Sequence, residues 1–207
     1  TSKSLLDSAL SYLNKQQEIE ATQKQNRDFV RVYYLLNDYQ KMIGYAAQLK
    51  PASINDAWAA YRIGEAYFQL QQPDSALPWY QRATEIWKYS LDFQNKYGIC
   101  LLALRKLPEA KQVFDFVVSE NPDHISANTN LGFIYMQQGQ STMAYDYLMR
   151  ANHINPDYEQ NLINMAVWYH TNNQDSKAKK TVLHLLKKHP NNETGRAMLQ
   201  DLMRKGS

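Results

Sequence analysis

The chain has 207 residues, of which 44% are hydrophobic and 12% aromatic, and its formal net charge is +3. No apolar run approaches the roughly 18 residues that would be read as a membrane-spanning helix. The single Cys100 excludes an intramolecular disulfide framework. These bounds favour one ordered globular protein, and the small positive charge gives no independent reason to expect a polyanion as ligand.

The first predicted element is a helix near the N-terminus. Residues 3–20 begin with an apolar stripe and turn polar from Lys15 to Glu20; the stripe consists of Leu5, Leu6, Ala9, Leu10 and Leu13. Apolar residues at these intervals share one face of a helix. We therefore expect residues 1–22 to form one helix, which either leads into the rest of the chain or is the second half of a truncated repeat.

Small residues then recur at a fixed interval of 34 positions. One series comprises Gly64, Gly98, Gly132 and Ala166, and a second comprises Ala76, Ala110, Ala144 and Ala178. A third series contains the prolines Pro122, Pro156 and Pro190. A constant period of this length is typical of stacked two-helix repeats. Gly and Ala would let the two helices of each repeat approach closely.

The residues between these positions identify the repeat. One unit carries Leu131, Gly132 and Tyr135, followed by Ala144, Leu148, Ala151 and Pro156. This pattern resembles the tetratricopeptide repeat, a helix–turn–helix unit with the same period. The resemblance covers residues 57–190. The position that holds tryptophan in the family pattern is occupied here by Ala60, Gln94, Asn128 and Leu162, and Lys88 replaces the first proline.

The resemblance implies an all-α fold, a right-handed α-solenoid of stacked antiparallel helix pairs. Four clear repeats are expected at 57–90, 91–124, 125–158 and 159–192, and residues 193–205 are expected to form a capping helix. The same register predicts a degenerate repeat at 23–56, whose core positions are Phe29, Val30, Tyr33, Met42, Ala46 and Leu49. We expect all of these elements to form one domain, because no segment has the composition of a flexible linker.

The links between paired helices carry turn and capping residues. Gly139 is expected to end one helix, and Pro108 is expected to open another, where its missing N–H has no partner to lose. Ser141 and Asp175 are predicted to cap the helices that follow their links.

The sequence contains no pattern typical of an enzyme. The histidines His124, His153, His170, His184 and His189 have no metal-ligand spacing, and the phosphate-binding glycine loop and the hydrolase nucleophile motif are absent. We expect Cys100 to be a buried, unreactive thiol. No catalytic residue, metal or cofactor is predicted. The basic run of Lys177, Lys179, Lys180, Lys187 and Lys188 is interpreted as a solvated face, so no nucleic-acid partner is expected.

The remaining surface is the concave groove that such arrays form from the first helix of each repeat. Steps along each first helix away from its packed face give the predicted groove. The first two clear repeats contribute Trp58, Tyr61, Arg62, Glu65, Phe68, Asn95, Lys96, Ile99 and Leu102. The next two contribute Thr129, Asn130, Phe133, Met136, Ile163, Asn164, Val167 and His170.

One position of this groove is polar in every repeat: Arg62, Lys96, Asn130 and Asn164. In tetratricopeptide relatives that bind extended peptides, this position often holds an asparagine or a basic residue that contacts the ligand backbone or its carboxylates. The resemblance implies the same role here. An asparagine side chain has both a donor and an acceptor, so it can pair with any peptide unit. The basic and Asn residues stand in a different order from the dicarboxylate clamp of chaperone-binding relatives, and Glu65 intrudes, so chaperone-tail binding is not expected.

The apolar groove residues admit two interpretations, because a large exposed apolar patch usually has a function. In the first interpretation, a peptide or helix of a partner protein fills the groove. In the second, the patch is covered by the N-terminal helix, by a second copy of the chain or by deeper packing. The first interpretation predicts a non-catalytic protein–protein interaction scaffold. The alternative is a structural or regulatory segment of a larger protein that mediates homo-oligomeric assembly, suggested by Tyr33, Tyr34, Tyr39 and Tyr45.

The compartment is left open by the sequence. We expect a soluble protein without membrane insertion, either cytoplasmic or, if a leader was removed before Thr1, periplasmic or exported.

Overall fold

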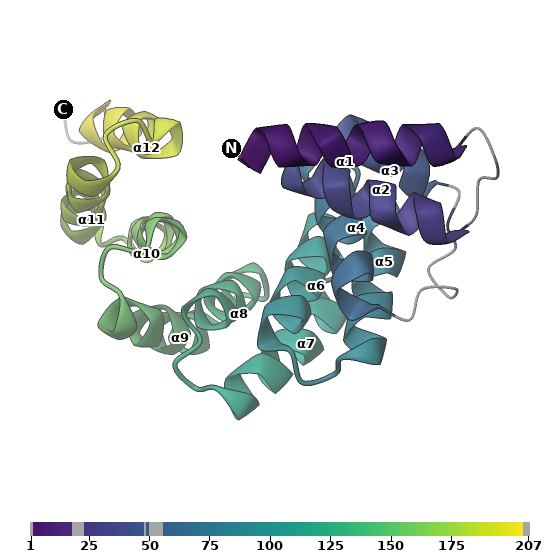
Figure 1. Ribbon diagram of the computed structural model, residues 1–207. Coiled ribbons are helices and arrows are strands. Elements are labelled where there is room, and N and C mark those ends of the chain that lie inside the picture. Colours follow the sequence, from purple (N-terminus) through teal and green to yellow (C-terminus); the bar gives the residue numbers. More distant parts are fainter. Residues whose placement is uncertain (1, 18–22, 48, 50–55, 205–207) are drawn as a thin grey trace. The chain divides into compact units, whose positions relative to one another are not determined.

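The structure of the chain, a computed structural model, describes residues 2–17, 23–47, 49 and 56–204 (Figure 1). The described residues form helices and connecting turns, without a strand, so the predicted all-α fold is confirmed. Parts of the predicted leading helix, of the repeat at 23–56 and of the capping helix fall on residues 18–22, 48, 50–55 and 205, which lie outside the described residues. None of the described helices is both long enough and apolar enough to cross a membrane.

The helices follow the period of the small-residue series. In chain order they are α1 Ser2–Gln17, α2 Gln23–Leu35, α3 Tyr39–Ala46, α4 Ala57–Gln69, α5 Pro73–Ile86, α6 Leu91–Ala103, α7 Leu107–Glu120, α8 Ile125–Gln137, α9 Ser141–Ile154, α10 Glu159–Thr171, α11 Asp175–Lys188 and α12 Glu193–Arg204. From α4 onward, a helix of 13 residues alternates with one of 14, until α12. Each predicted range from 57 to 192 therefore contains one first helix and one second helix.

The chain divides into two compact units. Unit 1 is Thr1–Ala110 and unit 2 is Lys111–Ser207, so the boundary falls inside α7. In unit 1, α2 packs on α3 and α4, and α4 packs on α5. In unit 2, α8 packs on α9, α10 packs on α9 and α11, and α12 packs on α11. The two first helices α8 and α10 also contact each other, which is the stacking expected of an α-solenoid. The grouping of all repeats into one domain stays a prediction.

The glycines of the small-residue series allow close helix packing. A Cβ atom added at Gly64 would lie 2.9 Å from the ring of Tyr80, and one added at Gly132 would lie 2.6 Å from Leu148 Cδ2. Gly64 and Gly132 belong to the first helices α4 and α8, whereas Tyr80 and Leu148 belong to their partners α5 and α9. Any larger side chain would force the paired helices apart, so these glycines set the distance between them.

The links inside the helix pairs recur with the same period. Each contains one residue in the left-handed region: Asn37 (φ 55°), Gln71 (φ 59°), Arg105 (φ 59°), Gly139 (φ 72°) and Asn173 (φ 58°). Gly139 follows the end of α8, as predicted, and needs no side chain to be accommodated at this φ. The two asparagines tolerate the conformation better than most residues, whereas Gln71 and Arg105 hold it at a cost in free energy.

Two predicted helix caps are wrong. Ser141 and Asp175 are the first residues of α9 and α11, so the N-cap positions fall on the residues before them, Gln140 and Gln174. The Ser141 hydroxyl instead donates to Asn172 Oδ1 at 2.8 Å, and the Asp175 carboxylate contacts His170 Nδ1 at 2.6 Å. Neither residue therefore occupies the N-cap position of the helix that it begins.

The helices α2 and α3, where a degenerate repeat is predicted, supply an aromatic part of the core of unit 1. All six predicted core residues of this repeat are buried: Phe29, Val30, Tyr33, Met42, Ala46 and Leu49. The ring centroids of Phe29 and Tyr45 are 4.3 Å apart, and those of Tyr33 and Tyr45 are 5.6 Å apart. Stacked rings in this range add to the stability gained from burial.

Candidate interaction surface

In unit 1, two of the predicted groove residues form an ion pair with each other. Glu65 of α4 is only 8% exposed, and its Oε2 lies 3.1 Å from Lys96 Nζ of α6. The Tyr80 hydroxyl donates to Glu65 Oε2 at 2.9 Å, and Gln69 Nε2 donates to Oε1 at 2.8 Å. The positive charge of Lys96 is therefore largely balanced by a carboxylate of the same unit.

The surroundings of Glu65 keep its carboxylate ionised. Burial by itself would raise the pKa of Glu65, but the hydrogen bond from Gln69, the charge of Lys96 and the hydrogen bond from Tyr80 outweigh it. The pKa of Glu65 consequently lies below its ordinary value. Burial and the neighbouring carboxylate raise the pKa of Tyr80, so its hydroxyl remains a donor.

The groove residues Trp58 and Arg62 of α4 belong to a cluster of aromatic side chains in unit 1. The Trp58 ring is 5.0 Å from that of Phe93 and 6.3 Å from that of Trp87, both edge-on. The Arg62 guanidinium lies 5.7 Å from the Trp58 ring and 5.2 Å from the ring of Tyr34. Arg62 is thus held by aromatic faces. The remaining residues of this part of the predicted groove are half-buried: Tyr61, Phe68, Asn95, Ile99 and Leu102.

In unit 2, two predicted groove residues are buried between α8 and α10. Thr129 is 1% exposed and donates from its hydroxyl to Asn161 Oδ1 at 3.4 Å. Asn164 is 5% exposed; its Nδ2 donates to the Thr129 carbonyl at 3.4 Å, and its Oδ1 accepts from Gln160 at 3.2 Å. The Asn164 amide therefore joins two stacked first helices, and we do not count it among the side chains offered to a partner.

The other predicted residues of unit 2 keep part of their surface. Asn130, Phe133, Met136, Ile163, Val167 and His170 are all half-buried. Asn130 Nδ2 uses one of its two N–H groups to donate to Ser126 Oγ at 3.4 Å within α8. Its second N–H and its carbonyl oxygen remain for the expected pairing with a peptide backbone.

A pocket of about 310 Å³ lies between the C-terminal ends of α8 and α10 and is called here the α8–α10 pocket. It is lined by Met136, Gln137, Gly139, Ser141, Val167, Trp168, Thr171 and Asn172. Trp168 Nε1 donates to the Ser141 carbonyl at 2.9 Å, and Asn172 Nδ2 donates to the Trp168 carbonyl at 2.7 Å. The first of these bonds fixes the indole as one wall, while Met136 and Val167 supply apolar surface.

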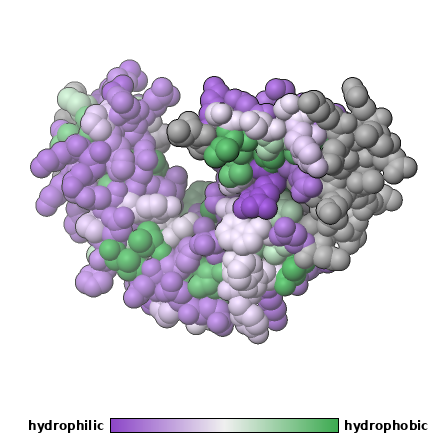
Figure 2. Space-filling model, in the orientation of Figure 1, coloured by the Kyte–Doolittle hydropathy of each residue, from purple (hydrophilic) through white to green (hydrophobic). Residues whose placement is uncertain are grey.

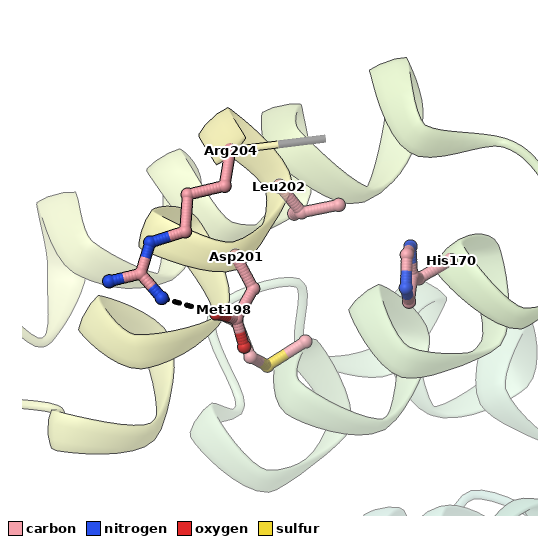
Figure 3. A pocket seen from close by; sticks show the side chains of 5 residues that line it. All are labelled: His170, Met198, Asp201, Leu202 and Arg204. Carbon is pink, nitrogen blue, oxygen red and sulfur yellow. Dashed lines mark ion pairs between the residues drawn. The ribbon is translucent and has the colours of Figure 1, made fainter. Parts of the chain in front are cut away.

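A second pocket of about 290 Å³ lies between α10 and α12 and is called the α10–α12 pocket. It is lined by His170, Met198, Asp201, Leu202 and Arg204. In Figure 3 the His170 ring stands across the pocket from the side chains of α12, and Arg204 Nη1 is 3.9 Å from Asp201 Oδ1. The pocket thus combines apolar surface from Met198 and Leu202 with both signs of charge.

The second pocket repeats the groove positions of the preceding helix. Met198, Asp201 and Arg204 stand one full period after Asn164, Val167 and His170. They are absent from the predicted groove, which ends at α10 because residues 193–205 are expected to form a cap. Extending the same register by one more repeat would have found three of the five residues that line this pocket.

Cys100 has the properties of an unreactive thiol. It is buried, its Sγ donates to the Pro73 carbonyl at 3.3 Å, and burial raises the pKa of the thiol to about 12. Among the described residues, no group of three or more His, Cys, Asp or Glu side chains is arranged to hold a metal ion.

Comparison with known proteins gives consistent matches. The tetratricopeptide repeat family is matched by residues 59–86 and 125–158. The tetratricopeptide repeat-containing protein trd-1 of Caenorhabditis elegans is 25% identical over 187 residues, which cover 88% of this chain. The chain spans only 24% of the length of that relative.

Solved structures with the same arrangement of helices cover most of the chain. YrrB, described as a TPR protein with an unusual peptide-binding site, is 27% identical and has a TM-score of 0.69, with 78% of this chain and 84% of that chain covered. PilW, a type IV pilus biogenesis factor, is 21% identical with a TM-score of 0.67, covering 81% and 78%. MamA of Desulfovibrio magneticus RS-1 is 15% identical with a TM-score of 0.68, covering 83% and 97%. The last two likenesses concern the fold alone.

Proposed function

Because the chain belongs to the tetratricopeptide repeat family, we propose that it is a protein–protein interaction scaffold that binds an extended segment of a partner along the first helices of unit 2. Proteins built from this repeat are generally non-catalytic. The proposal rests on one observation: two adjoining pockets occupy corresponding positions along α8, α10 and α12, and both contain residues of the predicted groove.

The spacing of the pockets suggests the form of the ligand. Packed helices lie about 8–10 Å apart. A segment in the polyproline II conformation advances about 3.1 Å per residue with three residues per turn, so every third side chain points to the same side. A partner segment that crosses α8, α10 and α12 would therefore place every third side chain into a pocket. The first anchor would be apolar, to contact Met136 and Val167. The second would place an apolar side chain on Met198 and Leu202, with a polar group near Asp201 or Arg204.

A peptide library displayed on phage and selected on the protein tests this proposal. The selected peptides are expected to carry two apolar residues three positions apart, and Val167→Glu is expected to weaken their binding at least about tenfold, because it places an unpaired charge against an apolar anchor. Met143→Glu is the matched control, since Met143 is 41% exposed on the second helix α9 and lines neither pocket. Peptides that bind Val167→Glu as tightly as the wild type would disprove the assignment.

Self-assembly is the second candidate function. The sequence suggests it through the tyrosines of residues 23–56, whereas the structure supports it through exposed residues of α1. Tyr33 is buried and Tyr45 stacks on Phe29, so these tyrosines belong to the core of unit 1. Leu5 and Tyr12 of α1 are instead 74% and 63% exposed. If α1 pairs with a second copy, light scattering will show a mass that rises with concentration, and Leu5→Glu will abolish the rise. A constant monomer mass would dismiss this candidate.

A further inference from the structure

The helix α11, the second helix of the predicted repeat at 159–192, differs in charge from the rest of unit 2. It contains five lysines and one aspartate, whereas the other residues of unit 2 include five basic and eight acidic side chains. One repeat earlier, the positions of the five lysines are occupied in α9 by Met143, Tyr145, Asp146, His153 and Ile154. The positive charge is therefore a property of this one helix and is not part of the repeat pattern.

Three of these lysines lie on the outer face of α11 together with an exposed leucine. Lys179, Lys180 and Lys187 are exposed, and Leu183, three or four positions from each along the helix, is 50% exposed. The opposite face of the helix, with Ala178, Val182 and Leu185, is buried. The surface over α11 is hydrophilic in Figure 2.

The outer lysines are available to an external anion. Lys188 forms an ion pair with Asp157 at 2.6 Å, and Lys177 lies over the ring of Tyr169 at 5.6 Å. Within the part of the chain that the structure describes, no carboxylate is recorded within ion-pair distance of Lys179, Lys180 or Lys187. Surface lysines are often only solvated. Here an exposed leucine stands between them, so the same face offers both positive charge and apolar surface.

The neighbouring helices limit the width of a bound anion. Asp146 is exposed on α9 at the position that corresponds to Lys180, and Glu193 and Asp201 are exposed on α12. A nucleic acid duplex or an anionic membrane carries negative charge over an area much wider than one helix, so it would also meet these carboxylates. A ligand as narrow as a single polypeptide segment can contact α11 alone.

We propose that the outer face of α11 is a second docking surface, for an acidic polypeptide segment that seats an apolar side chain on Leu183 and carboxylates on Lys180 and Lys187. Lys180 and Lys187 are two helical turns apart, about 10 Å along the helix. A partner helix with Glu, Leu and Glu at successive intervals of three and four positions matches this spacing. This surface is separate from the proposed peptide pockets, because no residue of α11 is among those that line them.

The test uses a short synthetic helical peptide, fluorescently labelled, that carries Glu, Leu and Glu at these intervals. Its binding to the full chain is measured by fluorescence anisotropy at about 50 mM salt, where screening is weak. The double variant Lys180→Glu/Lys187→Glu is expected to bind at least about tenfold more weakly, because two attractions become repulsions. Leu183→Ala is expected to weaken binding about threefold or more through the lost apolar contact.

Matched controls separate this surface from net charge and from the pockets. Lys3→Glu/Lys106→Glu makes the same change in net charge at two exposed residues outside α11, and it is expected to change the affinity less than about threefold. Val167→Glu is expected to leave binding of the acidic peptide unchanged, so the failure of one proposal is distinguishable from the failure of the other.

Several results would overturn the proposal. One is acidic-peptide binding that survives the Lys180→Glu/Lys187→Glu change, and another is no binding by the wild type at about 1 mM peptide, the weak end of specific affinities. The third is tighter binding of a single-stranded oligonucleotide, or of phosphatidylserine vesicles, that the same double change abolishes. That last result would assign the face to polyanions in place of a polypeptide.

Discussion

At the scale of single residues, the left-handed positions in the helix links predict how substitutions there change the free energy of unfolding. Arg105 has φ 59° and Gly139 has φ 72° at corresponding positions of two repeats. A left-handed conformation costs a residue with a side chain about 1–2 kcal/mol, and glycine avoids this cost but loses more entropy on folding. We expect Arg105→Gly to raise the free energy of unfolding by about 0.5–1 kcal/mol and Gly139→Ala to lower it by about 1 kcal/mol. Urea denaturation measures both changes. If both substitutions change the free energy of unfolding in the same direction, this explanation of the links is wrong.

Glu65 gives unit 1 a specific dependence on pH. Because its native pKa is lowered, its interactions stabilise the fold fully above the ordinary pKa of a glutamate, and that contribution is lost as the pH falls through the lowered native value. Glu65→Gln is expected to reduce the free energy of unfolding by about 1–3 kcal/mol near pH 7, because the hydrogen bonds and the ion pair lose their charged partner. The difference from the wild type should shrink as the pH falls below about 4.

Urea denaturation at a series of pH values measures this difference, and Glu120→Gln is the control. Glu120 is exposed at the end of α7, so its substitution is expected to change stability by less than about 0.5 kcal/mol. A Glu65→Gln effect of the same size at pH 7 and pH 3 would show that the carboxylate charge is not its source.

At the scale of helix pairs, Gly132 fixes the distance between α8 and α9. Gly132→Val is expected to lower the free energy of unfolding by about 1–3 kcal/mol, because the new side chain would overlap the buried Leu148. Gly44→Val is the matched control. A Cβ atom at Gly44 in α3 would have no neighbour within 4 Å, and valine is a slightly better helix former than glycine. If both variants lose the same stability, overlap with Leu148 does not explain the loss.

The helix pairs also show how far the sequence predicts the surface. The repeat period predicted the helices and the close approach at Gly64 and Gly132, because both depend on local spacing. It placed Thr129 and Asn164 in the groove, but these side chains are buried where α8 and α10 contact each other. The lateral packing of one first helix on the next depends on tertiary geometry, which the spacing along a single helix does not contain.

At the scale of the whole molecule, the repeat organisation predicts local unfolding. Each repeat contacts mainly its neighbours, so damage in one repeat should not spread evenly. In native-state hydrogen exchange, Gly132→Val is expected to reduce the protection of α8, α9 and α10 much more than that of α4 and α5. A uniform loss of protection in both units would contradict this expectation and indicate one cooperative structure.

The central proposal is that unit 2 holds a partner segment in the pockets between α8, α10 and α12. NMR can observe the methyl groups of four residues that line these pockets: Met136, Val167, Met198 and Leu202. A methyl-resolved NMR titration with a peptide selected on the protein observes them directly, with the exposed Met143 methyl of α9 as an internal reference. We predict that the four pocket residues shift together at one affinity while Met143 stays constant. Saturable binding that leaves all four unchanged would contradict it.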